Sequence, residues 1–417
     1  QKEGYIVKFE AASVNTDKTT MLVFELKLST TNNKPPTTPV LITPLDNAIN
    51  QSLDLNLIWT ATDVEKDSLK YEISLRKENS DEVVIYPNIS KTNFTLKGLN
   101  YSTKYYWQVS VSDGINPFVL SAVRAFTTTA FSSARLLFVK KSVENNVIYS
   151  GDDSGNQLRL TSLDVNSWRP RKNNQIKKIA FIRASGSQNH IYTMNPDGSG
   201  IFKVTNSIPI AGFNSDFLNF SWNTSGSQII YPYFDKLYRI NSDGSGLTKI
   251  YQTPNGKFIS ECDWSNDGSK IALKVNDSNG YNAEIYVISP AGALITQVWS
   301  GTTGAIGGLN FSITGQKLVF TRDVSGYEDA NYRQLDTRVF QYFFSSSTAS
   351  EISLEKPAGT VDLDVRYSPN EAELIIMNTS NDGVSTKNIV KCTPAANNSA
   401  GVSRTIIFAN ASMPDWE

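Results

Sequence analysis

The segment Trp264-Ser265-Asn266-Asp267-Gly268-Ser269-Lys270-Ile271-Ala272 is the clearest structural signal in the sequence. It joins an aromatic residue at the end of one strand to an Asp-Gly turn and then to an apolar strand, which is the pattern of an antiparallel hairpin. The same order returns at residues 222–230 and again at 311–320. A pattern that recurs in successive segments predicts a repeat protein.

Six aromatic residues mark the ends of such strands, separated by 42 to 56 residues: Trp168, Trp222, Trp264, Phe311, Tyr367 and Trp416. A second motif closes a later hairpin of the unit. It ends in the turns Asn195-Pro196-Asp197-Gly198 and Asn241-Ser242-Asp243-Gly244. Each unit then contains about four strands, which is one blade of a β-propeller. The sequence therefore predicts six blades.

Residues 131–417 resemble the PD40 (WD40-like) repeats of TolB-type six-bladed propellers, in which a W-S-P-D-G motif opens the blade. Phe311 and Tyr367 depart from this pattern because they replace the Trp. The strand 414–416 ends the chain with no blade after it, whereas 136–139 begins the region with no aromatic strand before it. We therefore expect the C-terminal strand to complete the first blade and close the ring.

Residues 35–130 carry short alternating strands at the spacing of a β-sandwich. The run from Leu99 to Val111 resembles the fibronectin type III pattern, in which Tyr105 would be the corner tyrosine and Trp59 a core group. Residues 1–34 hold two further alternating runs, 5–9 and 21–28, which we expect to be strands of an unassigned module. The predicted fold class is all-β, a fibronectin type III-like sandwich followed by a closed six-bladed propeller.

Charge and cysteine content narrow the function classes. The net charge of −1 comes from 39 basic and 40 acidic residues without a basic stripe, which argues against nucleic acid as a partner. No apolar run approaches the roughly 18 residues that span a bilayer.

Cys262 and Cys392 fall in different blades, so we expect two buried thiols and no disulfide. The chain begins with Gln1, as expected of a processed or trimmed sequence whose signal peptide or lipidated Cys has gone.

Catalytic and metal motifs are sparse. His190 is the single histidine, and we expect a structural role for it at the surface of a hairpin. No G-x-S-x-G elbow occurs, and the oxygen-rich turns at 195–200 and 241–246 lack the full calcium-loop pattern, so we predict no cofactor and no metal. We expect Asp263 and Asp415 to bond to blade turns. The alternative is a polysaccharide-acting enzyme that uses inner-ring carboxylates, among them Asp216, Glu261, Asp362 and Asp364.

Two long loops break the repeat, at residues 205–216 and 323–336. The second carries Tyr327, Tyr332 and Arg333, residue types that are enriched in interfaces, so we expect a partner surface there. A solvated loop without a partner is the alternative. If the loop is an exposed interface, the triple substitution to Ala weakens partner capture and leaves the melting temperature unchanged.

The resemblance to TolB-type propellers implies a function. It suggests a non-catalytic binding or scaffolding protein of a Gram-negative cell envelope, exported to the periplasm or the outer-membrane surface, with a lipid anchor as one means of attachment. The implied partners are an envelope or outer-membrane protein complex, or a glycan. The predicted binding residues are Tyr327, Tyr332, Arg333, Asp216, Glu261 and Asp364.

Overall fold

The computed structural model describes residues 33–130, 135–397 and 399–416, together with the single residues Tyr5, Thr16, Thr19, Met21 and Val23. The chain divides into two compact units, residues 1–132 and 133–417. The strands expected at 5–9 and 21–28 lie outside the described residues, apart from isolated positions. Among the described residues, no helix has the length and apolar character needed to cross a membrane.

The first unit contains a β-sandwich of two sheets. One sheet has the order β1 (Val40–Thr43), β3 (Leu55–Thr60), β6 (Asn93–Leu96). The other has the order β2 (Ala48–Gln51), β9 (Arg124–Thr128), β7 (Lys104–Ser112), β4 (Lys70–Lys77), β5 (Val83–Ile89), with β8 (Val119–Leu120) paired to β7. Alternate residues of each inner strand face the core, because successive side chains of a strand point to opposite faces.

Aromatic residues fill the core of the sandwich. Trp59 is fully buried and packs edge-on against Tyr71, with ring centroids 5.4 Å apart. Tyr105 stacks on Phe126, and its hydroxyl accepts a hydrogen bond from the Asn100 backbone N–H at 2.9 Å. This bond fixes the corner before β7, as expected of a corner tyrosine.

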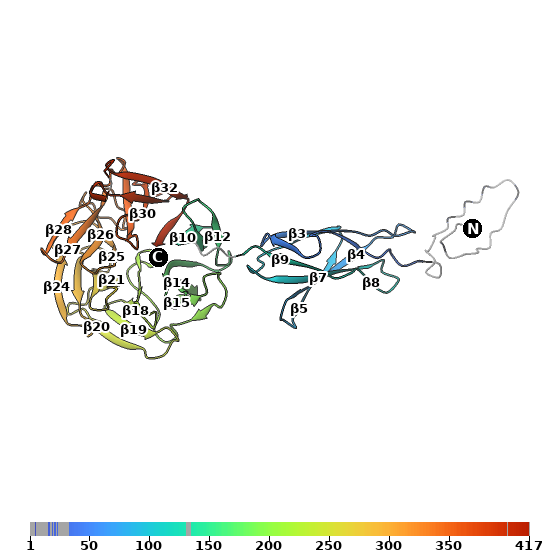
Figure 1. The fold of residues 1–417 in the computed structure, drawn as a ribbon, viewed down its shortest axis with the longest axis horizontal. Coiled ribbons are helices and arrows are strands. Elements are labelled where there is room, and N and C mark those ends of the chain that lie inside the picture. The colour runs from blue at the N-terminus through green and yellow to red at the C-terminus, as the bar shows by residue number, and fades with distance from the viewer. Residues whose placement is uncertain are drawn as a thin grey trace. The chain divides into compact units, whose positions relative to one another are not determined.

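The second unit is a propeller of six four-stranded antiparallel blades (Figure 1). The first blade has β33 (Ser412–Trp416), β10 (Leu136–Lys141), β11 (Asn146–Gly151) and β12 (Gln157–Arg159), and the second has β13 (Ser167–Asn173), β14 (Lys178–Ser185), β15 (Gln188–Met194) and β16 (Phe202–Lys203). The third has β17 (Ser221–Trp222), β18 (Gln228–Tyr233), β19 (Lys236–Asn241) and β20 (Thr248–Gln252), and the fourth has β21 (Phe258–Trp264), β22 (Ile271–Asn276), β23 (Glu284–Ile288) and β24 (Leu294–Trp299). The fifth has β25 (Ile306–Phe311), β26 (Lys317–Asp323), β27 (Thr337–Phe343) and β28 (Thr348–Glu351), and the sixth has β29 (Thr360–Tyr367), β30 (Leu374–Ser380), β31 (Asn388–Thr393) and β32 (Ser403–Ala409). Two 3-10 turns, η2 (Ser215–Phe217) and η3 (Ala395–Asn397), interrupt the connections.

The C-terminal strand closes the ring, as the sequence predicted. β33 pairs antiparallel with β10, with Leu136 opposite Trp416 and Leu137 opposite Asp415. Figure 1 shows this last strand, in red, beside β10 in green. One blade is thereby built from both ends of the propeller, so the ring presents no open inner edge there.

The repeated turns are held by their own side chains. The Asp267 carboxylate accepts hydrogen bonds from the Ser265 hydroxyl and from the hydroxyl and N–H of Ser269, which lower its pKa to about 2. Gly268 has a φ of +74°, a region that L side chains rarely adopt. In the Asn-x-Asp-Gly turn at 195–198, Asp197 likewise accepts from the N–H and hydroxyl of Ser199. The oxygen-rich appearance of these segments is therefore explained by turn formation.

The register corrects one aromatic position. Trp222 pairs with Ile229 and Trp264 with Ile271, but the residue of the second blade in the same place is Lys172, opposite Ile179. Trp168 lies four residues earlier, and its indole N–H donates to the Ser215 carbonyl. The prediction that Trp168 lies at the end of its strand, as Trp222 does, was wrong, because Trp168 is near the start of β13 and a lysine occupies the aromatic position of this blade.

Candidate functional site

The six inner strands bring equivalent positions to one end of the propeller channel. The positions directly before the repeat aromatics, or before Lys172 in the second blade, are all polar. We call this set the mouth ring: Arg171, Ser221, Asp263, Asn310, Arg366 and Asp415. All six residues line one cavity of about 330 Å³, which we call the mouth.

Side chains of the mouth ring join each blade to the next. Asp415 accepts a hydrogen bond from the Lys172 backbone N–H at 2.8 Å, and Asp263 accepts one from the Phe311 N–H at 2.7 Å. Asn310 and Ser221 accept equivalent bonds from the next inner strands. We expected Asp263 and Asp415 to bond to blade turns, but they bond to the backbone of neighbouring inner strands. Much of the mouth ring is therefore committed to holding the propeller closed.

The two arginines of the mouth ring differ in their contacts. Arg171 donates from Nε to the Asn219 side-chain oxygen at 3.1 Å and from Nη1 to the Pro170 carbonyl at 2.8 Å. Arg366 lies 3.4 Å from Asp415 through its Nε and 3.9 Å from Asp263 through Nη1. Its Nη2 is buried and has no hydrogen-bond partner among the described residues. A buried donor without an acceptor is uncommon and calls for an explanation.

The rim of the mouth is polar and uncharged for most of its length. It consists mainly of amides and hydroxyls from the blade turns: Asn173, Asn174, Gln175, Asn223, Thr224, Asn266, Ser312 and Ser368. The aromatic rings that line the mouth are mostly covered, since Trp222, Phe311, Tyr367 and Trp416 are each at most 7% exposed. The mouth thus offers many hydrogen-bonding groups and little aromatic surface.

A second layer lies two residues earlier on the inner strands: Arg169, Asn219, Glu261, Gly308, Asp364 and Met413. Several of these strands are bulged there, and Arg169 and Asp364 have φ values of +52° and +51°. Arg169 forms an ion pair with Asp364 of the sixth blade, two blades away in the ring, and also donates to the Asp216 carbonyl. Non-glycine residues in this conformation are strained, and such strain often accompanies functional sites.

The two long loops close the other end of the channel together. Tyr332, from the 323–336 loop, packs against Phe213, Phe217 and Tyr281 with ring centroids 4.8 to 5.0 Å apart. We call these four residues the plug. Gly280 fits beneath them, because a Cβ there would lie 2.5 Å from Phe213 and 2.6 Å from Tyr332. The plug is an apolar cluster with Tyr332 only 5% exposed.

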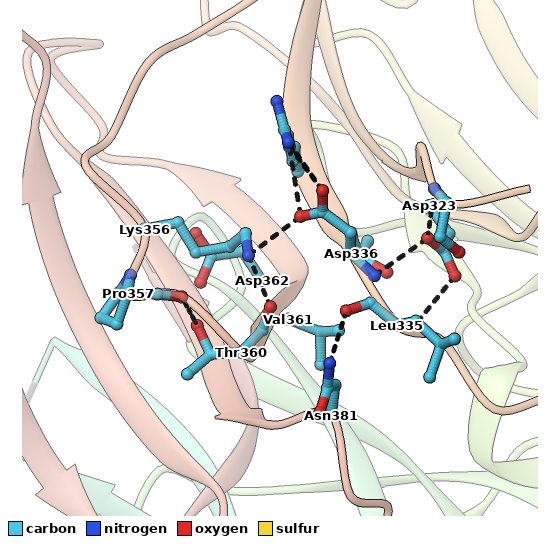
Figure 2. A network of polar contacts seen from close by, with 12 residues as sticks. Asp323, Leu335, Asp336, Lys356, Pro357, Thr360, Val361, Asp362 and Asn381 are labelled. Atoms are coloured by element: carbon cyan, nitrogen blue, oxygen red, sulfur yellow. Dashed lines mark hydrogen bonds and ion pairs between the residues drawn. The ribbon is translucent and has the colours of Figure 1, made fainter.

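A polar network anchors the base of the loop that carries Tyr332 (Figure 2). The buried Asp323 carboxylate accepts hydrogen bonds from the backbone N–H groups of Leu335 and Asp336 at 2.8 and 3.0 Å. Asp336 forms an ion pair with Lys356 at 3.1 Å, and Asn381 donates to the Leu335 carbonyl. Both ends of the loop are thus tied to the fifth and sixth blades, which argues against a freely solvated loop.

Beneath the plug lies Lys274, a fully buried amine. Its Nζ donates to the Tyr332 hydroxyl at 3.1 Å and lies over the Phe213 and Tyr332 rings. Burial lowers the pKa of Lys274 to about 8, against the opposing influence of Glu261. Burial also raises the pKa of Glu261, whose carboxylate accepts from the Gly308 and Leu309 N–H groups.

This amine makes the stability of the chain pH-dependent. Between about pH 8 and the ordinary lysine value near 10.5, the unfolded state binds more protons at this position than the folded state. The free energy of unfolding of the wild type, measured against Lys274→Met by urea titration, is expected to rise over this interval by on the order of 3 kcal/mol. A difference between the two proteins that stays constant from pH 7 to pH 10 would contradict the assignment.

The structure does not gather the six predicted binding residues on one surface. Tyr327 and Arg333 are exposed on the 323–336 loop, and Arg333 donates from Nε to the Asn381 carbonyl. Tyr332 is buried in the plug and Glu261 is buried below it. Asp364 is mostly enclosed through its ion pair, whereas Asp216 is exposed and uses only its carbonyl toward Arg169. Their binding roles stay predictions.

Asp362 does not reach the open mouth. It is buried in the sixth blade, where Arg404 and Asn378 bond to its carboxylate. Cys262 and Cys392 are free buried thiols, as predicted. His190 is buried, not at the surface as expected, because it points inward from β15 toward Thr205.

Sequence reasoning missed Arg171 and Arg366. A signal for them was present in the repeat. Each arginine lies at the same place in its blade as Asp263 and Asp415, directly before the repeat aromatic or the lysine that replaces it.

Sequence reasoning also missed a group of acids in the sandwich, Asp63, Asp67 and Asp113, whose carboxylate oxygens lie within 4.8 Å of one another. Burial, followed by the charges of Asp63 and Asp113, raises the pKa of Asp67. We assign no cation to this group, because the acids alone do not define one.

No family model matches the chain, and no curated protein matches it. Among solved structures, TolB from Acinetobacter baumannii is similar at a TM-score of 0.52 and 12% identity, covering 76% of this chain and 79% of that one. A quinonprotein alcohol dehydrogenase-like protein from Bacteroides thetaiotaomicron has a TM-score of 0.49 at 10% identity, covering 91% and 99%. An oligogalacturonate lyase from Vibrio parahaemolyticus has a TM-score of 0.42 at 13% identity, covering 66% and 71%. The likeness to TolB shows that the chain has the fold of a TolB-like β-propeller.

Proposed function

We propose that this chain is a non-catalytic binding module of a bacterial cell envelope, and that the mouth of its propeller takes an extended segment of a partner protein. The observation that carries the proposal is the mouth itself, a cavity of about 330 Å³ lined by inner strands from every blade. Binding sites are typically concave, with a few polar groups converging from rigid elements. A cavity of this size suits a few residues of chain and is too small for a folded domain.

The envelope location rests on resemblance. The propeller is TolB-like, and the fibronectin type III-like pattern of the sandwich is common in secreted and surface proteins of bacteria. The partner that follows from this location is an envelope or outer-membrane protein complex, with a lipid anchor as one way of holding the chain there. Fractionation of the native cells should place the protein in the periplasm or with the outer membrane, and recovery with the cytoplasm would contradict the location.

Two matched substitutions test where the partner binds. Ile313 lines the mouth and is 47% exposed, so Ile313→Arg places a long charged side chain in the cavity. Val384 is 89% exposed on the turn between β30 and β31. Asn381 connects this turn to the 323–336 loop, at the other end of the channel from the mouth. We expect Ile313→Arg to lower capture of the partner from native envelope extracts at least tenfold, and Val384→Arg to leave capture unchanged. Equal capture by both variants would exclude the mouth.

The alternative, a polysaccharide-acting enzyme, leads to a separate prediction. Glu261 lies under the plug and accepts two backbone N–H bonds, and Asp364 is paired with Arg169, so neither carboxylate is placed in the open mouth. We expect no turnover of polygalacturonate or of peptide substrates. Reproducible hydrolysis or lyase activity that is lost in Glu261→Gln or Asp364→Asn would move the enzyme ahead of the binding module.

A further inference from the structure

Arg366 is the member of the mouth ring whose bonding is incomplete. Its side chain is 9% exposed, and the nearest carboxylate oxygens lie 3.4 Å from Nε and 3.9 Å from Nη1. Both exceed the usual length of a charge-assisted hydrogen bond. Its Nη2 has no partner in the part of the chain that the structure describes. The guanidinium is therefore not held by a short bond, and one of its edges can turn toward the mouth, which Arg366 lines.

The neighbouring acids are committed elsewhere. Asp263 accepts from the Phe311 N–H and the Ser221 hydroxyl, and Asp415 accepts from the Lys172 N–H. These bonds join consecutive blades and fix both carboxylates. Asp415 therefore faces Arg366 Nε through its Oδ1 at 3.4 Å but cannot approach closer without disturbing the bond from its Oδ2 to Lys172. The acceptor for the Nη2 of Arg366 is therefore supplied by solvent or by a bound ligand.

The field around Arg366 favours an anion as that acceptor. Asp415 lies between Arg366 and Arg171, 3.4 Å and 3.6 Å from them, and Arg169 lies in the layer below. Burial, followed by the positive charges of Arg366 and Arg169, lowers the pKa of Arg171, and the charges of Asp415 and Asp364 offset only part of this shift. Repulsion between guanidinium groups is relieved when a negative group binds among them. A planar carboxylate matches the fork of an arginine with two parallel hydrogen bonds.

The surroundings distinguish a protein segment from a sugar. A sugar ring usually rests its apolar face on an exposed aromatic ring, but of the five rings that line the mouth four are at most 7% exposed and Trp264 alone is partly exposed. The amides of the exposed residues Asn174 and Gln175, which line the mouth, can both donate and accept, as the peptide main chain requires. We propose that Arg366 anchors a carboxylate of the bound protein segment, either its C-terminus or an Asp or Glu side chain. This inference rests on the proposed function and specifies the ligand chemistry at the same mouth.

Four probes separate the sources of the carboxylate. The first is a pool of acetylated hexapeptides without Asp or Glu that end in a free carboxylate. The second pool is amidated at the C-terminus and carries one central Asp or Glu, and the third is amidated and has no acid. The fourth probe is a mixture of oligogalacturonates. Affinity selection followed by mass spectrometry reports which probes the full chain retains.

We expect the wild type to retain the first or the second pool about tenfold more than the third, as one charge-assisted pair would give. Arg366→Gln should lose this preference, whereas Arg333→Gln, an exposed arginine tied to Asn381 at the other end of the channel, should keep it. Calorimetry establishes that each variant is folded. If Arg366→Gln does not fold, NMR of the unaltered chain is the deciding measurement. The Arg366 Nε–H resonance should then shift on titration with the first or the second pool.

Equal retention of all three peptide pools, or no shift of that resonance with either acidic pool, would overturn the carboxylate anchor. The proposed function would survive that result if Ile313→Arg still blocked capture of the native partner, so the two failures are distinguishable. Retention of oligogalacturonate alone, lost in Arg366→Gln, would overturn the protein segment and assign the site to an acidic glycan.

Discussion

A chain that lacks residues 411–417 is expected to lose the unfolding transition of its propeller, whereas the transition of the sandwich stays. β33 is the inner strand of the first blade, and it buries Met413 and Trp416 and supplies Asp415 to the mouth ring. Losing one large buried aromatic residue alone costs about 3 to 5 kcal/mol. Whole domains are stable by only about 5 to 15 kcal/mol, so removal of the strand is expected to unfold the ring. Differential scanning calorimetry measures both transitions.

A peptide with the sequence of residues 411–417 provides the control. If the deletion acts by removing the closing strand, the added peptide should restore the propeller transition in a concentration-dependent way, because it binds only the folded ring. A propeller transition that is unchanged by the deletion would refute closure by the C-terminal strand.

The substitution Tyr332→Ala is expected to destabilise the propeller by about 3 to 5 kcal/mol, the usual cost of emptying a buried aromatic site. Tyr332 packs against the other three plug residues, and its hydroxyl is the acceptor for the buried Lys274 amine. The sequence led us to expect an exposed Tyr332 whose replacement leaves the melting temperature unchanged. Its burial leads to the opposite expectation, which urea denaturation monitored by tryptophan fluorescence can measure.

Two milder substitutions separate the contribution of the Tyr332 ring from that of its hydroxyl and provide a control on the same loop. Tyr332→Phe keeps the ring but removes the acceptor of Lys274, so we expect a loss of about 1 to 3 kcal/mol. Tyr327→Ala, on the exposed part of the same loop, should stay within about 0.5 kcal/mol of wild type. If Tyr332→Ala were no more destabilising than Tyr327→Ala, the plug would not be a packed element.

The blades were predictable because their signals are local. The Asp-Gly turn after Trp264 and its counterparts after Trp222 lie within a few residues of the strands they join, so pattern and structure coincide. The closing strand was predictable by counting, since an aromatic strand without a blade must pair with a blade that lacks one. Trp168 was misplaced because an aromatic residue happens to lie on the same strand, four residues before the position that Lys172 fills.

The plug was not predictable, because its residues are distant in sequence and meet only after the ring has closed. Phe213 and Tyr332 lie on loops of different blades, and their polar and glycine-containing flanks are typical of exposed loops. The pairing of Arg169 with Asp364 likewise joins the second and sixth blades. No periodicity within a blade reports which loops fold inward.

The mouth was only half predictable. Asp263 and Asp415 drew attention because each precedes a Trp, but Arg171 and Arg366 precede Lys172 and Tyr367, where the repeat is weak. The incomplete bonding of Arg366 is visible only when the neighbouring acids are seen to be engaged with backbone N–H groups.

Hydrogen exchange of the chain with and without its captured partner locates the surface that the partner covers. We expect slower exchange in the turns that rim the mouth, at residues 173–175, 223–224, 312–313 and 368–369, with no change in the 323–336 loop. Protection confined to the sandwich, residues 35–130, or to the 323–336 loop would show that the partner binds elsewhere and would contradict the mouth as the binding site.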